Sequence, residues 1–176
     1  MSSLAFADLA TVSAGLLLGR LVLGLLMAAH GAQKLLGWFG GHGLDGTAGF
    51  FESLGFRPGR AFAMAAGLAE VGGGLLVALG FLGPVGPALI LSVMIVAALT
   101  VHWGHGLFAM SNGIEVPLLY ATGGLALALT GPGAYSLDAF LGLESLWTPS
   151  VAWTAIGLGI LGGIANLFAR RSPATV

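Results

Sequence analysis

Long apolar segments make up most of this 176-residue chain and limit what it can fold into. A helix that spans a bilayer needs about 20 mostly apolar residues, so the chain has room for four or five spans and little else. Charged residues amount to 7%, against roughly a quarter in soluble proteins. We therefore predict an all-α, polytopic membrane helix bundle that forms a single domain over 1–176. The expected spans are 14–38, 60–82, 86–103, 116–130 and 150–168.

The segment 42–56, between the first two spans, is too short and too polar to cross. Leu44, Ala48 and Phe51 recur near helical spacing, and Asp45 is a candidate N-cap. We expect a short helix that lies at the membrane surface, with an ordered loop as the alternative.

Charge and cysteine content exclude several functions. Six Lys and Arg against seven Asp and Glu give a net charge of −1, so no basic field exists to attract nucleic acid. The chain has no cysteine, which excludes disulfides, thiolate metal sites and Cys nucleophiles. Any redox role must therefore use a bound cofactor.

The basic residues outside the spans predict an orientation. With five spans, Arg57, Arg60, Arg170 and Arg171 all fall on one side of the membrane. Short cytoplasmic loops carry an excess of Lys and Arg, so we expect the N-terminus outside and the C-terminus in the cytoplasm. If 150–168 does not cross, the C-terminus moves outside.

Small residues repeat at helical spacing in two of the spans. Gly15 and Gly19 form one small-xxx-small pattern, and Gly159 and Gly163 form another. Such patterns let two helices approach closely, so we expect contact faces here, either within the bundle or between protomers.

Ionisable residues inside apolar spans are costly and usually face the bundle interior or a wet cavity. On the first span, Arg20, Met27 and Lys34 are seven residues apart and fall on one helix face, with His30 one turn before Lys34. Glu70 lies near the middle of the second span, among small residues that allow a neighbouring helix to approach.

Two histidines follow on the third span. His102 and His105 are three residues apart and share a face near its cytoplasmic end, and Glu115 lies in the loop before the fourth span, toward the same end. Depth and face together predict a pocket that penetrates about half the membrane from this side. Its expected lining is His30, Lys34, Glu70, His102 and His105.

Each of these residues has more than one interpretation. Glu70 can form a structural ion pair with Lys34 or Arg20, or it can exchange a proton with a ligand. His30 and His102 can be hydrogen-bonded core histidines or the two axial ligands of a haem b. A metal held by His102, His105 and Glu70 is a further alternative, although the sequence does not predict a metal site.

The sequence resembles the DoxX family of small bacterial membrane proteins over about 15–138. The matching pieces are 19–24 (GRLVLG), 30–35 (HGAQKL), 51–58 (FESLGFRP), 69–75 (AEVGGGL), His102, 113–115 (GIE) and 131–138 (GPGAYSLD). The resemblance implies a four-helix core in the bacterial inner membrane. The segment 139–176 departs from this pattern as an additional C-terminal helix, which docks a partner or closes one side of the bundle. It also implies a link to redox systems, because relatives include the small subunit of thiosulfate:quinone oxidoreductase.

Carried over to this chain, the family motif positions are Arg20, His30, Lys34, Glu70, His102 and Glu115. We expect a membrane subunit of a redox system that binds a quinone or a similar lipophilic ring, with carbonyl hydrogen bonds from His30 or His102 and Glu70 as the catalytic candidate for proton exchange. The alternatives are a non-catalytic scaffold subunit and a small-molecule permease. The expected partners are the lipid bilayer and either other membrane or redox subunits or a second copy of the chain.

Overall fold

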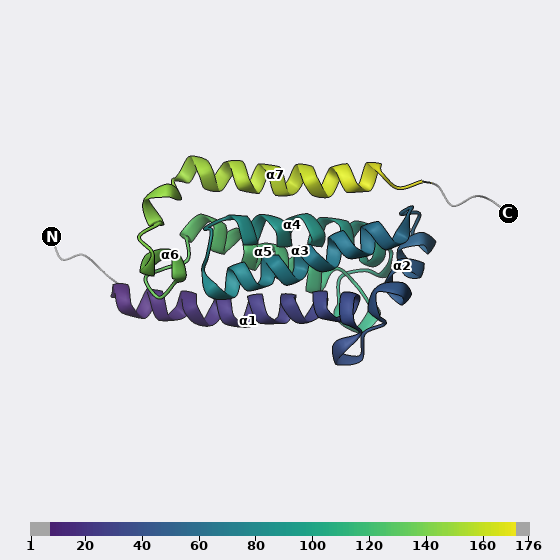
Figure 1. Ribbon diagram of the computed structural model, residues 1–176, viewed down its shortest axis with the longest axis horizontal. Helices are drawn as coiled ribbons and strands as arrows, with labels where there is room; N and C mark the ends of the chain where they lie inside the picture. Colours follow the sequence, from purple (N-terminus) through teal and green to yellow (C-terminus); the bar gives the residue numbers. More distant parts are fainter. Residues whose placement is uncertain (1–7, 172–176) are drawn as a thin grey trace.

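The computed structural model describes residues 8–171, and this part of the chain is helical without strands (Figure 1). Five helices lie side by side along the long axis of the molecule: α1 (Leu9–Leu36), α3 (Gly59–Leu79), α4 (Val85–Ala97), α5 (Glu115–Thr130) and α7 (Pro149–Phe168). The predicted all-α membrane bundle is confirmed.

Within residues 8–171, four helical stretches are long and apolar enough to cross a membrane: α1, α3, Val85–His105 and α7. The fourth predicted span, α5, has only 16 residues. At 1.5 Å per residue it is about 24 Å long, shorter than the roughly 30 Å hydrocarbon core. By itself, α5 is therefore too short to span this core.

The first helix begins earlier than predicted, at Leu9 rather than at residue 14. Asp8 is its N-cap and accepts a hydrogen bond from the Thr11 backbone N–H at 2.7 Å. This bond lowers the pKa of the exposed Asp8 carboxyl, because it stabilises the charged form. The helix ends at Gly37, whose φ of 72° stops further helical bonding.

Close packing between α1 and α3 depends on glycines spaced by seven residues on both helices. A Cβ at Gly24 would lie 2.4 Å from the Gly74 carbonyl oxygen, and one at Gly31 would lie 2.6 Å from the Gly67 carbonyl oxygen. The face of α1 that contains Arg20 and these glycines is therefore turned towards α3 and the interior.

The two small-xxx-small patterns differ in their surroundings. Gly159 and Gly163 of α7 pack against α4, where a Cβ at Gly159 would lie 2.6 Å from the Ala88 carbonyl oxygen. Gly15 and Gly19 face outward, and a Cβ at either would meet nothing within 4 Å. The second pattern is thus a contact within the bundle, whereas the first is not.

The third long helix changes its winding at its end. After α4 the chain forms a π-helical turn, Ala98–His102, and then a 3₁₀ turn, Trp103–His105. A π-helical turn inserts one extra residue and is frequent at functional sites. Here it ends at His102, one of the candidate site residues.

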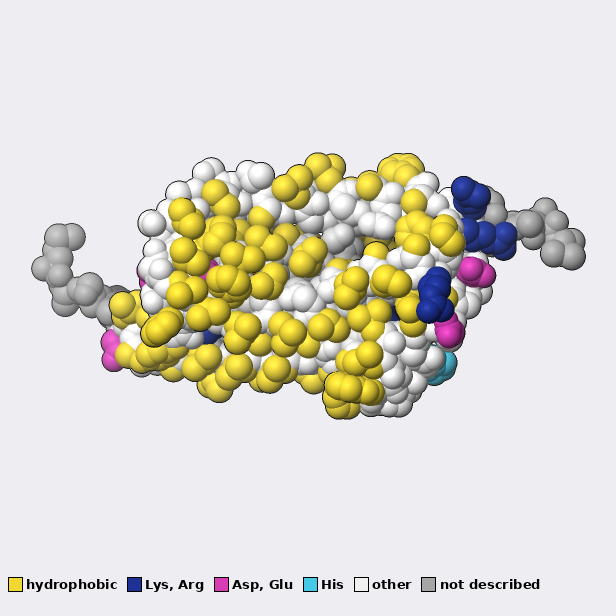
Figure 2. All heavy atoms as spheres, in the orientation of Figure 1, with side chains coloured by type: hydrophobic (Ala, Val, Ile, Leu, Met, Phe, Trp, Pro, Cys, Tyr) yellow, Lys and Arg dark blue, Asp and Glu magenta, His cyan; other side chains and the backbone are white. Residues whose placement is uncertain are grey.

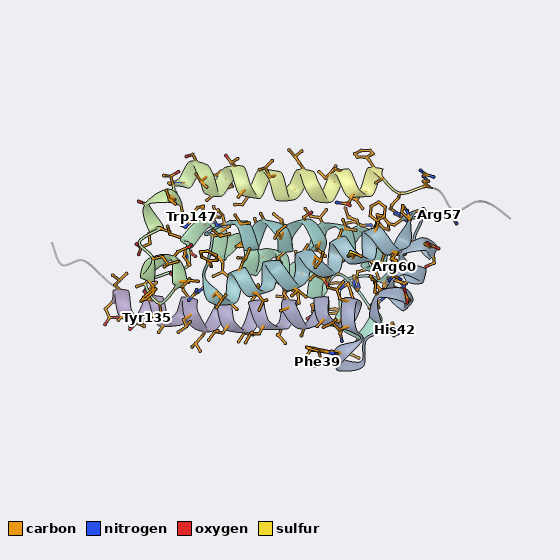
Figure 3. The ribbon with its side chains drawn as sticks, in the orientation of Figure 1. Phe39, His42, Arg57, Arg60, Tyr135 and Trp147 are labelled. Atoms are coloured by element: carbon orange, nitrogen blue, oxygen red, sulfur yellow. The ribbon has the colours of Figure 1, made fainter. Side chains whose placement is uncertain are left out.

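Short elements close the two ends of the bundle. The helix expected within 42–56 is present as α2 (Gly43–Ser53), which packs on α3 and α1, while its place at a membrane surface stays a prediction. The opposite end has α6 (Leu137–Phe140). The basic side chains visible in Figure 2 gather at the α2 end. Figure 3 places Arg57 and Arg60 at this end and Tyr135 at the other.

Candidate functional site

A cavity of about 420 Å³ lies towards the α2 end of the bundle, between α3, α4, α7 and α2. Most of its wall is apolar, with phenylalanines from α2 and α3, alanines from α3, and leucine and valines from α4. The polar lining residues are Lys34, Glu70, Ser92, Thr100, His102 and Asn166. A mainly apolar cavity of this size with a few converging polar groups is typical of a small-molecule site.

An ion pair forms part of the cavity wall. The Lys34 ammonium on α1 donates to both Glu70 carboxylate oxygens on α3, at 2.7 and 2.6 Å. The Glu70 side chain is only 2% exposed, whereas that of Lys34 is 26% exposed. The more accessible Lys34 is therefore held in place by a buried carboxylate that is itself neutralised.

His102 reaches the same cavity from the π-helical turn. Its Nδ1 lies 2.8 Å from the Asn112 carbonyl oxygen. A carbonyl only accepts hydrogen bonds, so Nδ1 carries a proton and donates it. In the neutral ring, Nε2 is then an acceptor that remains for a ligand.

The α2 end of the cavity is aromatic and is tied to the end of α7. Phe56 packs between Phe51 and Phe62, with ring centroids 5.6 and 5.2 Å away. The Arg170 guanidinium lies 5.7 Å from the Phe56 ring centroid, and its Nε donates to the Leu54 carbonyl oxygen at 2.9 Å. These contacts close the cavity towards that end.

Two of the expected histidines lie outside the cavity lining. His30 donates from Nδ1 to the Gln33 side chain, 3.2 Å away, and packs edge-on against Tyr120 of α5. His105 is exposed, and its Nδ1 donates to the Val101 carbonyl oxygen at 3.0 Å. Of the five residues expected to line one pocket, the structure brings together Lys34, Glu70 and His102.

The two remaining candidates serve other parts of the fold. Glu115 accepts a hydrogen bond from the Ala109 backbone N–H at 2.7 Å and so fixes the loop before α5. Arg20 is buried at the opposite end of the bundle, where it donates to the Tyr135 carbonyl oxygen.

Asp138 is a carboxylate with a structural role that the sequence did not predict. It is fully buried and accepts from the backbone N–H groups of Leu82 and Gly83, at 3.0 and 2.7 Å. It thereby fixes the turn between α3 and α4. Its place in a polar loop after α5 gave no sign that it would be buried.

Beside Arg20 the packing leaves a void of only about 10 Å³, the size of one water.

Sequence reasoning also missed part of the cavity lining. Three polar lining residues are uncharged: Ser92, Thr100 and Asn166. Glu70 was predicted because burying an ionised group is costly, and this cost does not apply to uncharged side chains. Residues 8–171 contain no cluster of three His, Cys, Asp or Glu side chains that could hold a metal ion.

Comparisons with known proteins agree with this architecture. A family model described as DoxX matches residues 15–103. Inner membrane protein YqjF from Escherichia coli (strain K12) is 31% identical over 127 residues, which cover 72% of this chain and 92% of the relative. No solved structure matches. The chain therefore belongs to the DoxX family and is a multi-pass protein of the inner membrane.

Proposed function

We propose that the protein is a membrane subunit of a redox system and that it binds a quinone, or a similar lipophilic ring, in the cavity between α3, α4 and α7. The observation that carries this proposal is the apolar cavity of about 420 Å³ with Lys34 and His102 at its wall. A quinone needs apolar surroundings for its ring and hydrogen-bonding groups for its oxygens.

The polar groups suit the two redox forms of such a ring. The Lys34 ammonium has a third N–H beyond the two that bind Glu70, and it can donate to a quinone carbonyl. His102 Nε2 can accept from a quinol hydroxyl when the ring is neutral. Glu70 then acts as a positioning residue that holds Lys34, and any proton it exchanges with a ligand passes by way of that contact.

Two histidines provide a matched test. We expect the purified protein to release a quinone on organic extraction, and added quinol to raise its thermal unfolding temperature. His102→Ala should abolish most of that increase, whereas His105→Ala should retain it, because His105 lies outside the cavity lining. Equal behaviour of the two variants, or a wild-type protein that neither contains nor responds to quinone, would contradict the proposal.

An absorption spectrum of the same sample tests the haem alternative. A Soret band that disappears in both His30→Ala and His102→Ala would assign these residues to haem b instead of a quinone.

A scaffold role for a larger assembly is the second candidate function. It is favoured by exposed apolar side chains in the segment after the π-helical turn, namely Trp103, Phe108 and Met110. Purification in mild detergent should then recover a second membrane or redox subunit, and Met110→Ser should reduce that recovery. A stable homo-oligomer without partner chains would count against it.

A permease finds less support, since the Arg20 end of the bundle has a void of only about 10 Å³.

A further inference from the structure

The floor and the walls of the cavity come from different helices. Ser92 and Val96 of α4 form its floor, while Ala65 and Ala69 of α3 and Asn166 of α7 form two facing walls. Both α3 and α7 pack on α4, but no extended packing joins α3 to α7 within the described part of the chain. Figure 2 shows the surface hollowed between these two helices.

The two ends of this hollow are closed. Towards α2, the Arg170 Nε donates to the Leu54 carbonyl oxygen, and the Arg171 backbone N–H donates to the Gly55 carbonyl oxygen at 2.9 Å. Farther along the bundle, α7 meets α4 so closely at Gly159 that a Cβ would lie 2.6 Å from the Ala88 carbonyl oxygen. The remaining opening is sideways, at the level of Ala65.

The sideways opening faces the hydrocarbon part of a bilayer. Exposed side chains of these two helices are apolar, among them Leu68 of α3, 57% exposed, and Leu161 of α7, 62% exposed. No charged residue of α3 or α7 lies between Glu70 and the arginines at the α2 end. Lipid chains are therefore the surroundings from which a ligand reaches this opening.

We propose that the ligand is a long-tailed ring lipid that reaches the cavity sideways from the bilayer and leaves its apolar tail in the slot between Ala65 and Asn166. This inference rests on the proposed function. It adds the path by which the ligand enters and the position of its apolar tail. A cavity of about 420 Å³ lies near the lower end of the 300–1,000 Å³ range that holds one drug-sized molecule. It accommodates a ring, but a long tail must leave through the opening.

The charge at the polar end selects the headgroup. The charge of Lys34 is neutralised by Glu70. The neutral His102 ring offers an acceptor nitrogen. Such a site suits the uncharged carbonyls of a ring and gives no excess positive charge to a phosphodiester. The occupant is thus a quinone-type lipid and not a phospholipid.

Photoreactive quinones in nanodiscs of zwitterionic phospholipid test this path. One azidoquinone has an isoprenoid tail and the other has none. Ala65→Trp places an indole in the slot, and Ala65 is exposed, so the change adds no atom to the packed core. Ala165→Trp is the matched control, because Ala165 is an exposed alanine of α7 outside the cavity lining.

We expect wild type and Ala165→Trp to be labelled on α3 and α4 by both probes. Ala65→Trp should keep its labelling by the tail-less probe and lose about tenfold in labelling by the tailed one, the effect of displacing one apolar group from a buried site.

Equal labelling of Ala65→Trp and wild type by the tailed probe would overturn the sideways path while the ring site stands. Loss of both probes in Ala65→Trp would also overturn it, because the slot would then belong to the ring and not to a tail. A wild-type protein that neither probe labels would overturn the proposed function and this inference together.

Discussion

Glu70 is almost completely buried, and among residues 8–171 its charge forms an ion pair only with the Lys34 ammonium. Removing one member of a buried ion pair leaves the other uncompensated, which typically costs about 3–5 kcal/mol. Because Lys34 is partly exposed, water compensates part of its charge, and the cost falls somewhat below that range.

We therefore expect Glu70→Gln to lower the free energy of unfolding by about 2–3 kcal/mol, measured by titration with SDS in mixed micelles. Replacing both partners, as in Lys34→Met with Glu70→Leu, should recover most of that loss, because no unpaired charge remains. Glu144→Gln is the control, since Glu144 is exposed. An SDS midpoint of Glu70→Gln equal to that of wild type would contradict the buried pair.

A second prediction at this scale uses the glycines of α1. Gly24→Ala should destabilise the bundle by about 1–3 kcal/mol, because its Cβ would lie 2.4 Å from the Gly74 carbonyl oxygen and force α1 and α3 apart. Gly15→Ala on the same helix meets nothing within 4 Å and should leave stability unchanged or slightly raised. SDS titration of both variants is the measurement, and equal effects would contradict the observed helix crossing.

At the scale of elements, α7 distinguishes this chain from a bare four-helix core. It packs on α4 through Gly159 and Gly163, and its end is bound to the loop after α2 by Arg170 and Arg171. It thereby forms one wall of the cavity. The resemblance had left two roles for the additional helix, and the structure favours closing one side of the bundle.

The absence of cysteine allows a direct test of this packing. A Cβ built at Gly162 lies 4.0 Å from the Ser92 Cβ, within the 3.5–4.5 Å range of disulfides. We expect Ser92→Cys with Gly162→Cys to form a disulfide under mild oxidation, detected after proteolysis between α4 and α7. The pair Ser92→Cys with Ala165→Cys should not, because Ala165 faces outward. Cross-linking of the control pair alone would place α7 differently.

Considered as a whole molecule, the bundle has two chemically different ends. The end with α2 has four arginines as well as Asp45 and Glu52 of α2, whereas Asp8, just before α1, and Glu144, just after α6, lie at the other end. Cytoplasmic loops are enriched in Lys and Arg, so we propose that the α2 end faces the cytoplasm. The cavity then lies in the cytoplasmic half of the membrane.

Single cysteines introduced into the cysteine-free chain measure this orientation. We expect Glu144→Cys to react with a membrane-impermeant maleimide in intact cells from which any outer membrane has been removed. Ser111→Cys and Arg171→Cys should react only after lysis. If Arg171→Cys reacts in intact cells but Ser111→Cys does not, α7 does not cross the membrane. If Ser111→Cys and Arg171→Cys both react in intact cells, the whole orientation is reversed.

The sequence by itself determined the helical bundle and the depth of its charges. In lipid every backbone N–H and C=O must be satisfied within the chain, so long apolar segments become helices whatever their neighbours are. The same cost of burying ionised groups made Arg20, Lys34 and Glu70 stand out before any contact was known. The inward face of the first helix followed from its spacing alone.

Only the tertiary structure decided which polar residues share a site. Lys34 and Glu70 meet, while His30 turns to Gln33 and Tyr120, because the rotation of each helix is fixed by close packing at particular glycines. With 31 glycines in the chain, the sequence does not show that Gly24 touches α3 while Gly15 faces outward. The cavity depends on these contacts, since its walls come from helices whose rotations must all be known at once.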